Sequence, residues 1–198
     1  MRYALNRTTD AATEPVTTAE LKKHMNITAA FTEDDDYIVT LEKAARYWVE
    51  DHTNRGLINQ SWTLQMDWWP ADGVIRLNRG PVSSVTSVKY EDVDGDTQTL
   101  VAGTDYQTDL VSKPARILPE PGATWPTLEA DRANAIEVVF VAGYGATAAS
   151  VLEDFKHAIK LLVGHWYEHR EDASDGKPPQ SIPMGMKQIL SHSVMPLI

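Results

Sequence analysis

The sequence predicts an α+β protein, in which a small α-helical bundle carries an inserted antiparallel β-rich lobe. Two observations predict this class. Apolar residues recur at steps of three and four in two long segments far apart in the chain, and between them the period falls to two, with turn signals at short intervals. Each helix must bury its apolar stripe, so we expect the two helices to pack together. A chain of 198 residues is long enough for one such domain.

The N-terminal part, residues 16–58, is expected to form the first helices of the bundle. Residues 1–15 are polar and without periodicity, which predicts a flexible arm. Thr17 and Glu20 have the spacing of a capping box, so a short helix should begin there. Thr32 is expected to cap the second helix, whose first turn holds four acidic residues where the helix dipole favours negative charge.

The second helix has two distinct sides. Its apolar stripe comprises Tyr37, Ile38, Leu41, Ala44, Ala45, Trp48 and Val49. The other side carries Glu42, Arg46 and Glu50, whose spacing of four predicts weak ion pairs. Gly56 is suited to the left-handed position that follows a helix end.

Residues 59–142 are expected to form the β-rich lobe. Trp62, Leu64, Met66 and Trp68 alternate with polar residues, which predicts a strand with one buried face. Further strands are predicted at 74–77, 83–90, 97–101, 106–109, 115–118 and 135–141. Turn dipeptides such as Asp94-Gly95 separate them, which favours an antiparallel meander.

Residues 143–171 should contain the long closing helix. Gly143-Tyr144-Gly145 indicates a strand-to-helix turn, and Ser150 and Glu153 have the spacing of a second capping box. The apolar face of this helix comprises Val151, Leu152, Phe155, Ala158, Ile159, Leu162, Val163 and Trp166. Residues 172–198 are expected to form a loop rich in helix breakers and an apolar tail.

Composition excludes several classes of protein. The chain has no cysteine, so disulfide scaffolds, thiolate zinc sites and cysteine nucleophiles are excluded. No secretory signal or membrane-length apolar run is visible, so we expect a soluble, cytoplasmic chain. The net charge of −10, with scattered Lys and Arg, argues against a protein that wraps duplex DNA.

A short motif near the end of the closing helix resembles a zinc site. His165, Glu168 and His169 match H-x-x-E-H, in which two histidines bind zinc and the glutamate activates water. A third protein ligand is needed, and the only later glutamate, Glu171, is too close in sequence to supply it. We therefore predict no metal, cofactor or catalytic residue, and keep a small zinc-dependent hydrolase as the alternative. Asp92, with the aspartates that follow, fits a hairpin turn better than a calcium loop.

The order of the sequence pieces resembles a known family. "LEKAARYWVEDHTNRGL" leads into "NQSWTLQMDWWP", followed by "IRLNRGPVSSVTSVKYEDVDGD", "DYQT", "VVFVAGYG" and "FKHAIKLLVGHWYEHRE". Over roughly residues 17–195 this series resembles the tailed-bacteriophage head–tail connector family, also called adaptor or head-completion proteins, in the branch with a β-rich insertion between the helices. Tyr167, Glu168 and Arg170 fall where the closing helix of that family has a similar ending.

The resemblance implies a structural virion protein and no enzyme. It implies an oligomeric ring, commonly a dodecamer, that binds beneath the portal, extends the DNA channel and offers a docking surface for the tail or the next completion protein. DNA would pass through without sequence-specific binding. The protein would reside at the head–tail interface of the virion, and in the host cytoplasm during assembly, with no membrane contact. A monomeric binding module is the other alternative.

Three sets of residues are candidates for these contacts. Ring contacts could involve loop aromatics, for which core packing is the equal alternative: Trp69, Trp125 and Tyr144. The apolar tail could bind the portal or fold back on its own bundle: Ile189, Leu190, Val194, Met195, Leu197 and Ile198. Acidic residues could line the channel and repel DNA: Glu33, Asp34, Asp35, Asp36, Glu91, Asp92, Asp94 and Asp96.

Overall fold

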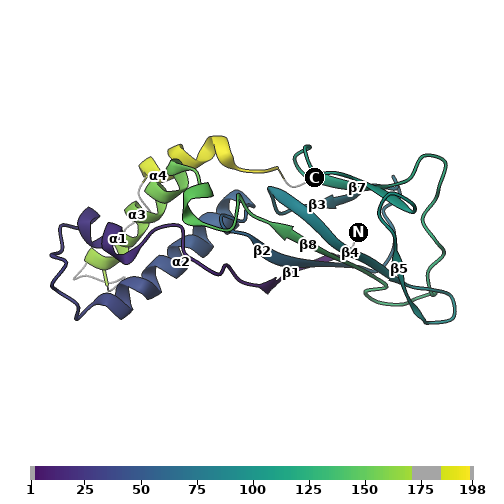
Figure 1. Cartoon of the computed structure of the whole chain (residues 1–198), viewed down its shortest axis with the longest axis horizontal. Helices are drawn as coiled ribbons and strands as arrows, with labels where there is room; N and C mark the ends of the chain where they lie inside the picture. The colour runs from purple at the N-terminus through teal and green to yellow at the C-terminus, as the bar shows by residue number, and fades with distance from the viewer. Residues whose placement is uncertain (1–2, 171–183, 197–198) are drawn as a thin grey trace, which may run out of the picture.

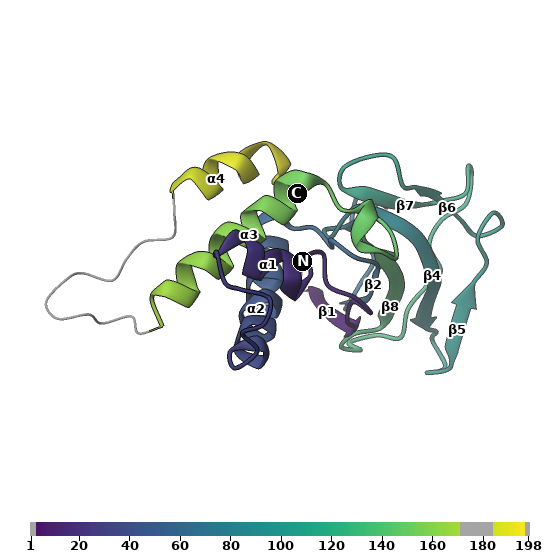
Figure 2. The same cartoon turned by 60° about the vertical axis from the view of Figure 1, so that its left-hand side comes forward.

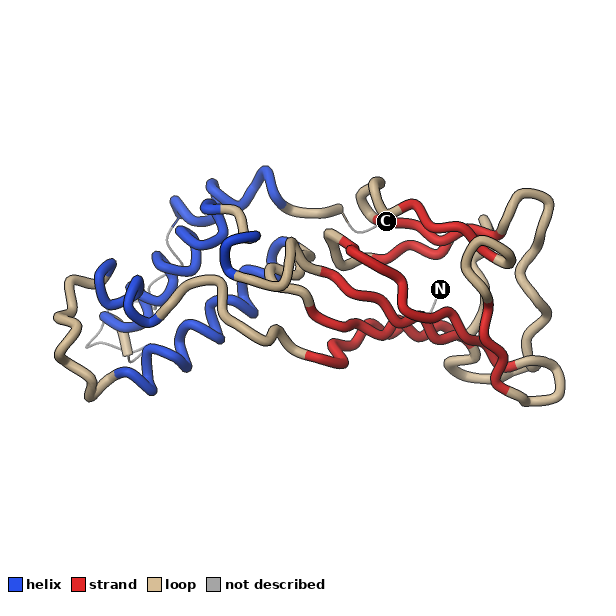
Figure 3. Tube along the Cα trace, in the orientation of Figure 1, coloured by secondary structure: helices blue, strands red, loops and turns tan. Residues whose placement is uncertain are grey.

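The computed structural model describes residues 3–170 and 184–196, in which helices and sheets occupy opposite ends of an elongated molecule (Figure 1). Figure 3 shows the same division, with helices gathered at one end and strands at the other. The predicted α+β class, with a helical bundle and a β-rich lobe, is confirmed.

The bundle is built around the two long helices. These are α2 (Asp35–Thr53) and α3 (Glu153–Glu168), which pack against each other as the two apolar stripes predict. The shorter α1 (Thr18–His24) and α4 (Met184–Leu190) complete the bundle, and α3 lies between α2 and α4 (Figure 2). Short 3₁₀ turns, η1 (Ala148–Ser150) and η2 (Ser191–Ser193), precede α3 and follow α4.

One apolar core unites these helices. From α2 it takes Ile38, Ala45 and Val49, and from α3 it takes Phe155, Ala158, Ile159, Leu162 and Val163. Leu21 of α1 and Met186 and Leu190 of α4 join the same cluster. Burying a large apolar side chain stabilises the fold by roughly 1.5–3 kcal/mol, so the bundle depends on residues that are far apart in sequence.

The helix ends agree with the sequence at one position and differ at three. The Thr17 capping box is present, with the Glu20 amide 3.3 Å from the Thr17 hydroxyl. The predicted Thr32 cap is wrong, because Asp34 occupies the N-cap of α2. The predicted Ser150 capping box is wrong as well, because Leu152 precedes α3. Asn54, with φ of 55°, takes the left-handed position predicted for Gly56.

The strands form two sheets rather than one meander. The larger sheet has the order β1-β2-β8-β4-β5, and the smaller has the order β3-β7-β6. The larger comprises β1 (Tyr3–Thr9), β2 (Gln60–Met66), β8 (Ile136–Ala142), β4 (Val82–Glu91) and β5 (Thr97–Leu100). The smaller comprises β3 (Ile75–Leu77), β7 (Ala115–Pro119) and β6 (Tyr106–Asp109). Every pairing within both sheets is antiparallel.

The two sheets share a second apolar core. The larger sheet contributes Trp62, Leu64, Met66, Val88, Ile136, Val138 and Phe140, and the smaller contributes Ile75, Leu77, Tyr106 and Ile117. Alternate residues of β2 are buried, as its period of two predicts, and alternate residues of β8 are buried as well. Trp68 departs from this pattern, because β2 ends at Met66 and the Trp68 side chain is 52% exposed.

The N-terminal segment is tied to the fold, so the prediction of a flexible arm is wrong for the described residues. Tyr3 pairs with Met66 and Arg7 with Trp62, which makes β1 an edge strand of the larger sheet. The Arg7 guanidinium lies 5.2 Å from the Trp62 ring centroid. The sequence did not reveal this strand, because β1 is formed by pairing with a distant strand and has no apolar periodicity of its own.

A buried ionic cluster joins this segment to α2. Arg46 is fully buried and donates five hydrogen bonds of 2.7–3.3 Å, to the carboxylates of Asp10, Glu14 and Glu50. Burial alone would raise the pKa of Asp10, but the hydrogen bonds from Arg46 and Tyr47 hold it below its ordinary value. Glu50 keeps a raised pKa because its desolvation outweighs its hydrogen bonds.

The expected Arg46–Glu50 ion pair is present, with Nη1 of Arg46 3.3 Å from Oε2 of Glu50, but it lies in the protein interior. Glu42, Arg46 and Glu50 are all buried, because the N-terminal segment covers the face that the helical period assigns to solvent. Such a cluster is costly to break, since removing one member leaves an uncompensated buried charge.

The Gly143-Tyr144-Gly145 turn connects β8 to the bundle at a point of close backbone approach. A Cβ atom at Gly143 would lie closer to the Asn59 nitrogen than real Cβ contacts come. The Tyr144 amide donates to the Leu57 carbonyl at 3.1 Å, and the Asn59 amide donates to the Gly145 carbonyl at 2.9 Å. Glycine at 143 thus lets the chain leave the sheet beside the connection from α2 to β2.

Candidate interaction surfaces

The H-x-x-E-H motif lies at the C-terminal end of α3. The rings of His165 and His169 are 4.7 Å apart, and Nδ1 of His169 lies 2.9 Å from the His165 carbonyl oxygen. Among the described residues, no group of three or more His, Asp or Glu side chains is placed to hold one metal ion. Glu171 lies outside the described residues. The geometry therefore gives the zinc-hydrolase alternative no further support.

Tyr167, near the end of α3, and Arg170, just after that helix, form a clamp instead. Tyr167 and Arg170 each donate a hydrogen bond of 2.5 Å to Oδ2 of Asp34, at the start of α2. The Arg170 guanidinium also lies over the rings of Tyr37 and Tyr167, at 4.7 and 4.8 Å. The hydrogen bonds from Tyr167 and Arg170 hold the pKa of Asp34 below its ordinary value. This clamp gives the Tyr-Glu-x-Arg ending a structural role, since it fastens the end of α3 to the beginning of α2.

The clamp also engages Asp34, which is one of the acidic residues proposed to line the channel. Asp35 is engaged as well, by the amine of Lys22. Glu33 and Asp36 remain exposed at this end of the molecule. Sequence alone could not separate these pairs, because a run of four carboxylates carries no sign of which have partners.

The second acidic cluster lies at the β4–β5 turn, at the opposite end of the molecule from the start of α2 (Figure 1). Asp92 organises the turn, accepting hydrogen bonds of 3.0 Å from the amides of Asp94 and Asp96. Glu91 is half-buried and accepts a hydrogen bond from Thr97 at 3.1 Å. Asp94 and Asp96 are exposed, and Gly95 has φ of 83°, so the predicted Asp-Gly hairpin is confirmed.

The three aromatic candidates for ring contacts are all engaged within the chain. Trp69 and Trp125 stack with centroids 4.5 Å apart and planes at 9°. Their indole N–H groups donate to the carbonyls of Pro126 and Gly73, at 2.8 and 2.9 Å. Tyr144 packs against Phe155 and accepts a hydrogen bond from Arg55 at 2.9 Å. Each of these three residues remains partly exposed.

Most of the described tail packs on its own chain. Leu190 and Met195 are buried, Ile189 is half-buried and Val194 is 41% exposed. Leu197 and Ile198 lie outside the described residues. For Leu190 and Met195, the structure therefore agrees with the alternative in which the tail folds back on its own chain.

Polar contacts from the end of α2 fix the tail. Arg55 donates to the Ser193 carbonyl at 2.5 Å, and the Asn54 side chain donates to the Met195 carbonyl at 2.9 Å. The Met195 amide in turn donates to the Thr53 carbonyl at 2.9 Å. The segment 193–195 is therefore held at the junction of the bundle and the β-rich lobe.

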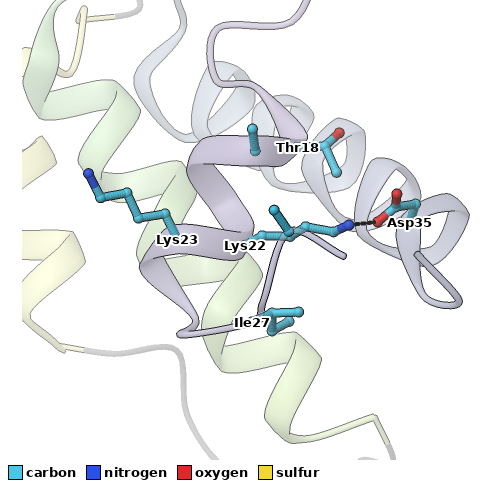
Figure 4. Close-up of a pocket in the computed structure, with 7 residues that line it drawn as sticks. Thr18, Lys22, Lys23, Ile27 and Asp35 are labelled. Carbon is cyan, nitrogen blue, oxygen red and sulfur yellow. Dashed lines mark ion pairs between the residues drawn. The ribbon is translucent and has the colours of Figure 1, made fainter. Parts of the chain in front are cut away.

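A pocket of about 420 Å³ opens beside α1 (Figure 4). Its lining comprises Thr18, Ala19, Lys22, Lys23, Ile27, Ala29 and Asp35. Lys22 reaches toward Asp35 and donates to the Phe31 carbonyl at 2.6 Å, whereas Lys23 points away from this pair. The charged pair is thus satisfied within the chain, and the pocket offers a mainly apolar hollow without a reactive group.

A second hollow, of about 340 Å³, lies at the far end of the β-rich lobe beside the exposed Trp68. Its lining comprises Asp67, Trp68, Leu128, Glu129, Asp131, Arg132 and Ala133. The sequence assigned Trp68 to a buried strand face and therefore missed this surface.

Comparisons with known proteins place the fold. No family model matches the chain, and no curated protein sequence matches it. Among the described residues, no helix has the length and apolarity to cross a membrane. Solved structures, however, contain chains with the same α+β fold over nearly the whole length.

These similar chains come from particles called gene transfer agents (GTA). One belongs to the neck of an empty GTA particle computed with C6 symmetry; identity is 24%, coverage is 98% of this chain and 97% of that chain, and the TM-score is 0.79. Another belongs to the virion of a native GTA particle, with 22% identity, 98% and 96% coverage and a TM-score of 0.79. A third belongs to the neck of a native GTA particle computed with C12 symmetry, with 24% identity, 98% and 97% coverage and a TM-score of 0.76.

Proposed function

We propose that this chain is a structural, non-enzymatic virion protein: a head–tail connector that forms a ring beneath the portal, extends the DNA channel and provides the docking surface for the tail. The observation that carries the proposal is the shared fold, which extends over 98% of the chain with a TM-score of 0.79 to a chain from a particle neck. The ordered sequence pieces that resemble the connector family support the same function independently.

The shape and surface of the protomer suit a ring. Closed rings need heterologous contacts, in which one surface patch meets a different patch on the next copy. The partly exposed residues Trp69, Trp125 and Tyr144 remain candidates for such contacts. The symmetries of the similar neck structures, C6 and C12, are compatible with a closed ring of this chain.

The portal contact is assigned to the end of the tail. Val194 is 41% exposed, and Leu197 and Ile198 follow it in sequence. Leu190 and Met195 would contribute indirectly, because they anchor the tail to the bundle.

The exposed acidic residues would keep DNA from adhering to the channel. The two clusters lie at opposite ends of the protomer, so a protomer set radially in the ring wall would present only one of them to the channel. Glu33 and Asp36 are the candidates at the helical end, and Asp94 and Asp96 at the β-rich end. Charge reversal of the pair that faces DNA should slow ejection, because basic groups would bind phosphates. Unchanged ejection for both reversed pairs would contradict this assignment.

Mass photometry of the full chain with and without the purified portal protein of the same phage tests the proposal. We expect a ring-sized complex on the portal, and a variant without residues 194–198 should bind far less. A chain that stays monomeric beside a native portal would refute the connector function. Stoichiometric zinc in the purified protein, with chelator-sensitive hydrolysis, would instead support the enzyme alternative.

A further inference from the structure

Trp68 is the most exposed aromatic residue of the part of the chain that the structure describes. Trp68 and Trp69 are adjacent, and only Trp69 faces the core, where it stacks on Trp125 and bonds to the Pro126 carbonyl. Trp68 is consequently turned outward and is 52% exposed. An exposed tryptophan at the edge of a hollow is typical of the residues that dominate binding energy at protein interfaces.

The hollow beside Trp68 is preformed. It lies between the loop after β2 and the loop before β8, and these loops are joined by a hydrogen bond of 2.8 Å from the Asn134 amide to Asp67. The Glu129 amide donates to the Glu91 carbonyl at 3.1 Å, which ties the second loop to the end of β4. A partner would therefore bind without first ordering these loops, which favours affinity.

The charge of the hollow selects the chemistry of its occupant. Asp67, Glu129 and Asp131 line it, against the single cation Arg132. Arg132 lies 4.0 Å from Glu91 and 3.9 Å from Glu129, so its charge is shared with carboxylates. The acidic β4–β5 turn is adjacent, since a Cβ at Gly95 would lie 3.7 Å from the Glu129 carboxylate. This surface repels phosphate and attracts cations.

We propose that this Trp68 hollow is a docking site for a segment of another protein that presents an arginine beside an aliphatic residue. A guanidinium stacks on an indole face and bonds to carboxylates in its own plane, which a lysine amine cannot do. The aliphatic neighbour would contact Leu128 and Ala133, the apolar part of the lining. The site lies at the far end of the β-rich lobe from the tail contact, and it does not depend on ring formation.

Titration of the full chain with a defined peptide tests the proposal. The probe is acetyl-Leu-Arg-Leu-Arg-Leu-Arg-amide, and its control replaces each arginine with citrulline, which keeps the shape and removes the charge. The indole N–H resonance of Trp68, assigned by its loss in Trp68→Ala, reports binding. We expect saturable shifts for the arginine peptide that weaken with salt, and about tenfold weaker binding of the citrulline peptide.

Variants locate the binding to the hollow. Trp68→Ala, monitored by isothermal titration calorimetry, should weaken binding about tenfold, and the fold should persist because the side chain is outside the core. Asp131→Asn removes one charge at an exposed position whose φ of 57° asparagine tolerates, and should weaken binding several-fold. Val93→Ala, at an exposed valine that does not line the hollow, is the matched control and should bind as the wild type does.

Five results would overturn the proposal. Four of them are absence of saturable binding at millimolar peptide, equal binding of the citrulline peptide, unchanged affinity of Trp68→Ala, and binding of duplex DNA that Trp68→Ala abolishes. Concentration-dependent self-association of the wild type that is lost in Trp68→Ala would also overturn it, since the occupant would then be a second copy. None of these results bears on portal binding, so the connector function would stand or fall separately.

Discussion

Glu42 in the middle of α2 provides a quantitative test of how the N-terminal segment packs on the bundle. Its side chain is only 3% exposed, and its Oε1 has no hydrogen-bond partner. Burial, with the nearby charge of Glu14, raises the pKa of Glu42 from 4.5 to about 8, although Arg46 opposes the shift. The carboxyl is therefore mostly protonated in the folded protein at pH 7 and ionised in the unfolded chain.

This difference makes stability depend on pH with a defined sign. The folded state holds the proton more tightly, so the contribution of Glu42 is fully present below about pH 4.5 and declines as pH rises toward 8. With these two pKa values, linkage lowers the free energy of unfolding by about 1 kcal/mol at pH 5 and about 3 kcal/mol at pH 7, relative to a side chain that stays neutral. Glu42→Gln removes this dependence. Its stability advantage over the wild type should therefore be about 2 kcal/mol larger at pH 7 than at pH 5.

Urea unfolding at both pH values, followed by circular dichroism, measures this gain. Glu168→Gln, at an exposed position of α3, is the control and should change stability equally at the two pH values. A Glu42→Gln effect that is the same at pH 5 and pH 7 would show that Glu42 is solvated, and that the N-terminal segment does not cover α2 as described.

Substitutions at three further places in the fold test individual contacts by chemical denaturation. Tyr167→Phe and Asp34→Asn should each lower the free energy of unfolding, and the double variant should lower it by less than the sum because both act on one clamp; full additivity would contradict the clamp. Arg46→Met should cost about 3–5 kcal/mol by leaving buried carboxylates uncompensated, and a neutral result would show that they are hydrated. Gly143→Ala should disrupt the junction by several kcal/mol, whereas Gly185→Ala, whose Cβ meets nothing within 4 Å, should be tolerated.

Strong local patterns in the sequence were reliable. The apolar stripes of the two long helices predicted their existence and their contact, and alternation in β2 predicted which of its residues are buried. The Thr17 capping box and the Asp94-Gly95 turn were also predictable, because each is decided by backbone conformation and hydrogen bonds within a few residues.

The interaction surfaces were less predictable. The run of acidic residues at 33–36 contains two carboxylates held by distant partners and two that are exposed, and nothing local distinguishes them. Trp68 and Trp69 are adjacent and chemically identical, and only the stack with Trp125, more than fifty positions later, decides which of them faces solvent.

The sequence by itself determined the α+β class, the two long helices and most strand positions, since these follow from the period of apolar residues. Tertiary structure alone decided that 3–9 is a strand, that Arg46 is buried, that the strands divide into two sheets and that the tail rests on its own bundle. The physical reason is the same in each case: these features depend on contacts between residues far apart in the chain, and such pairings leave no local periodicity.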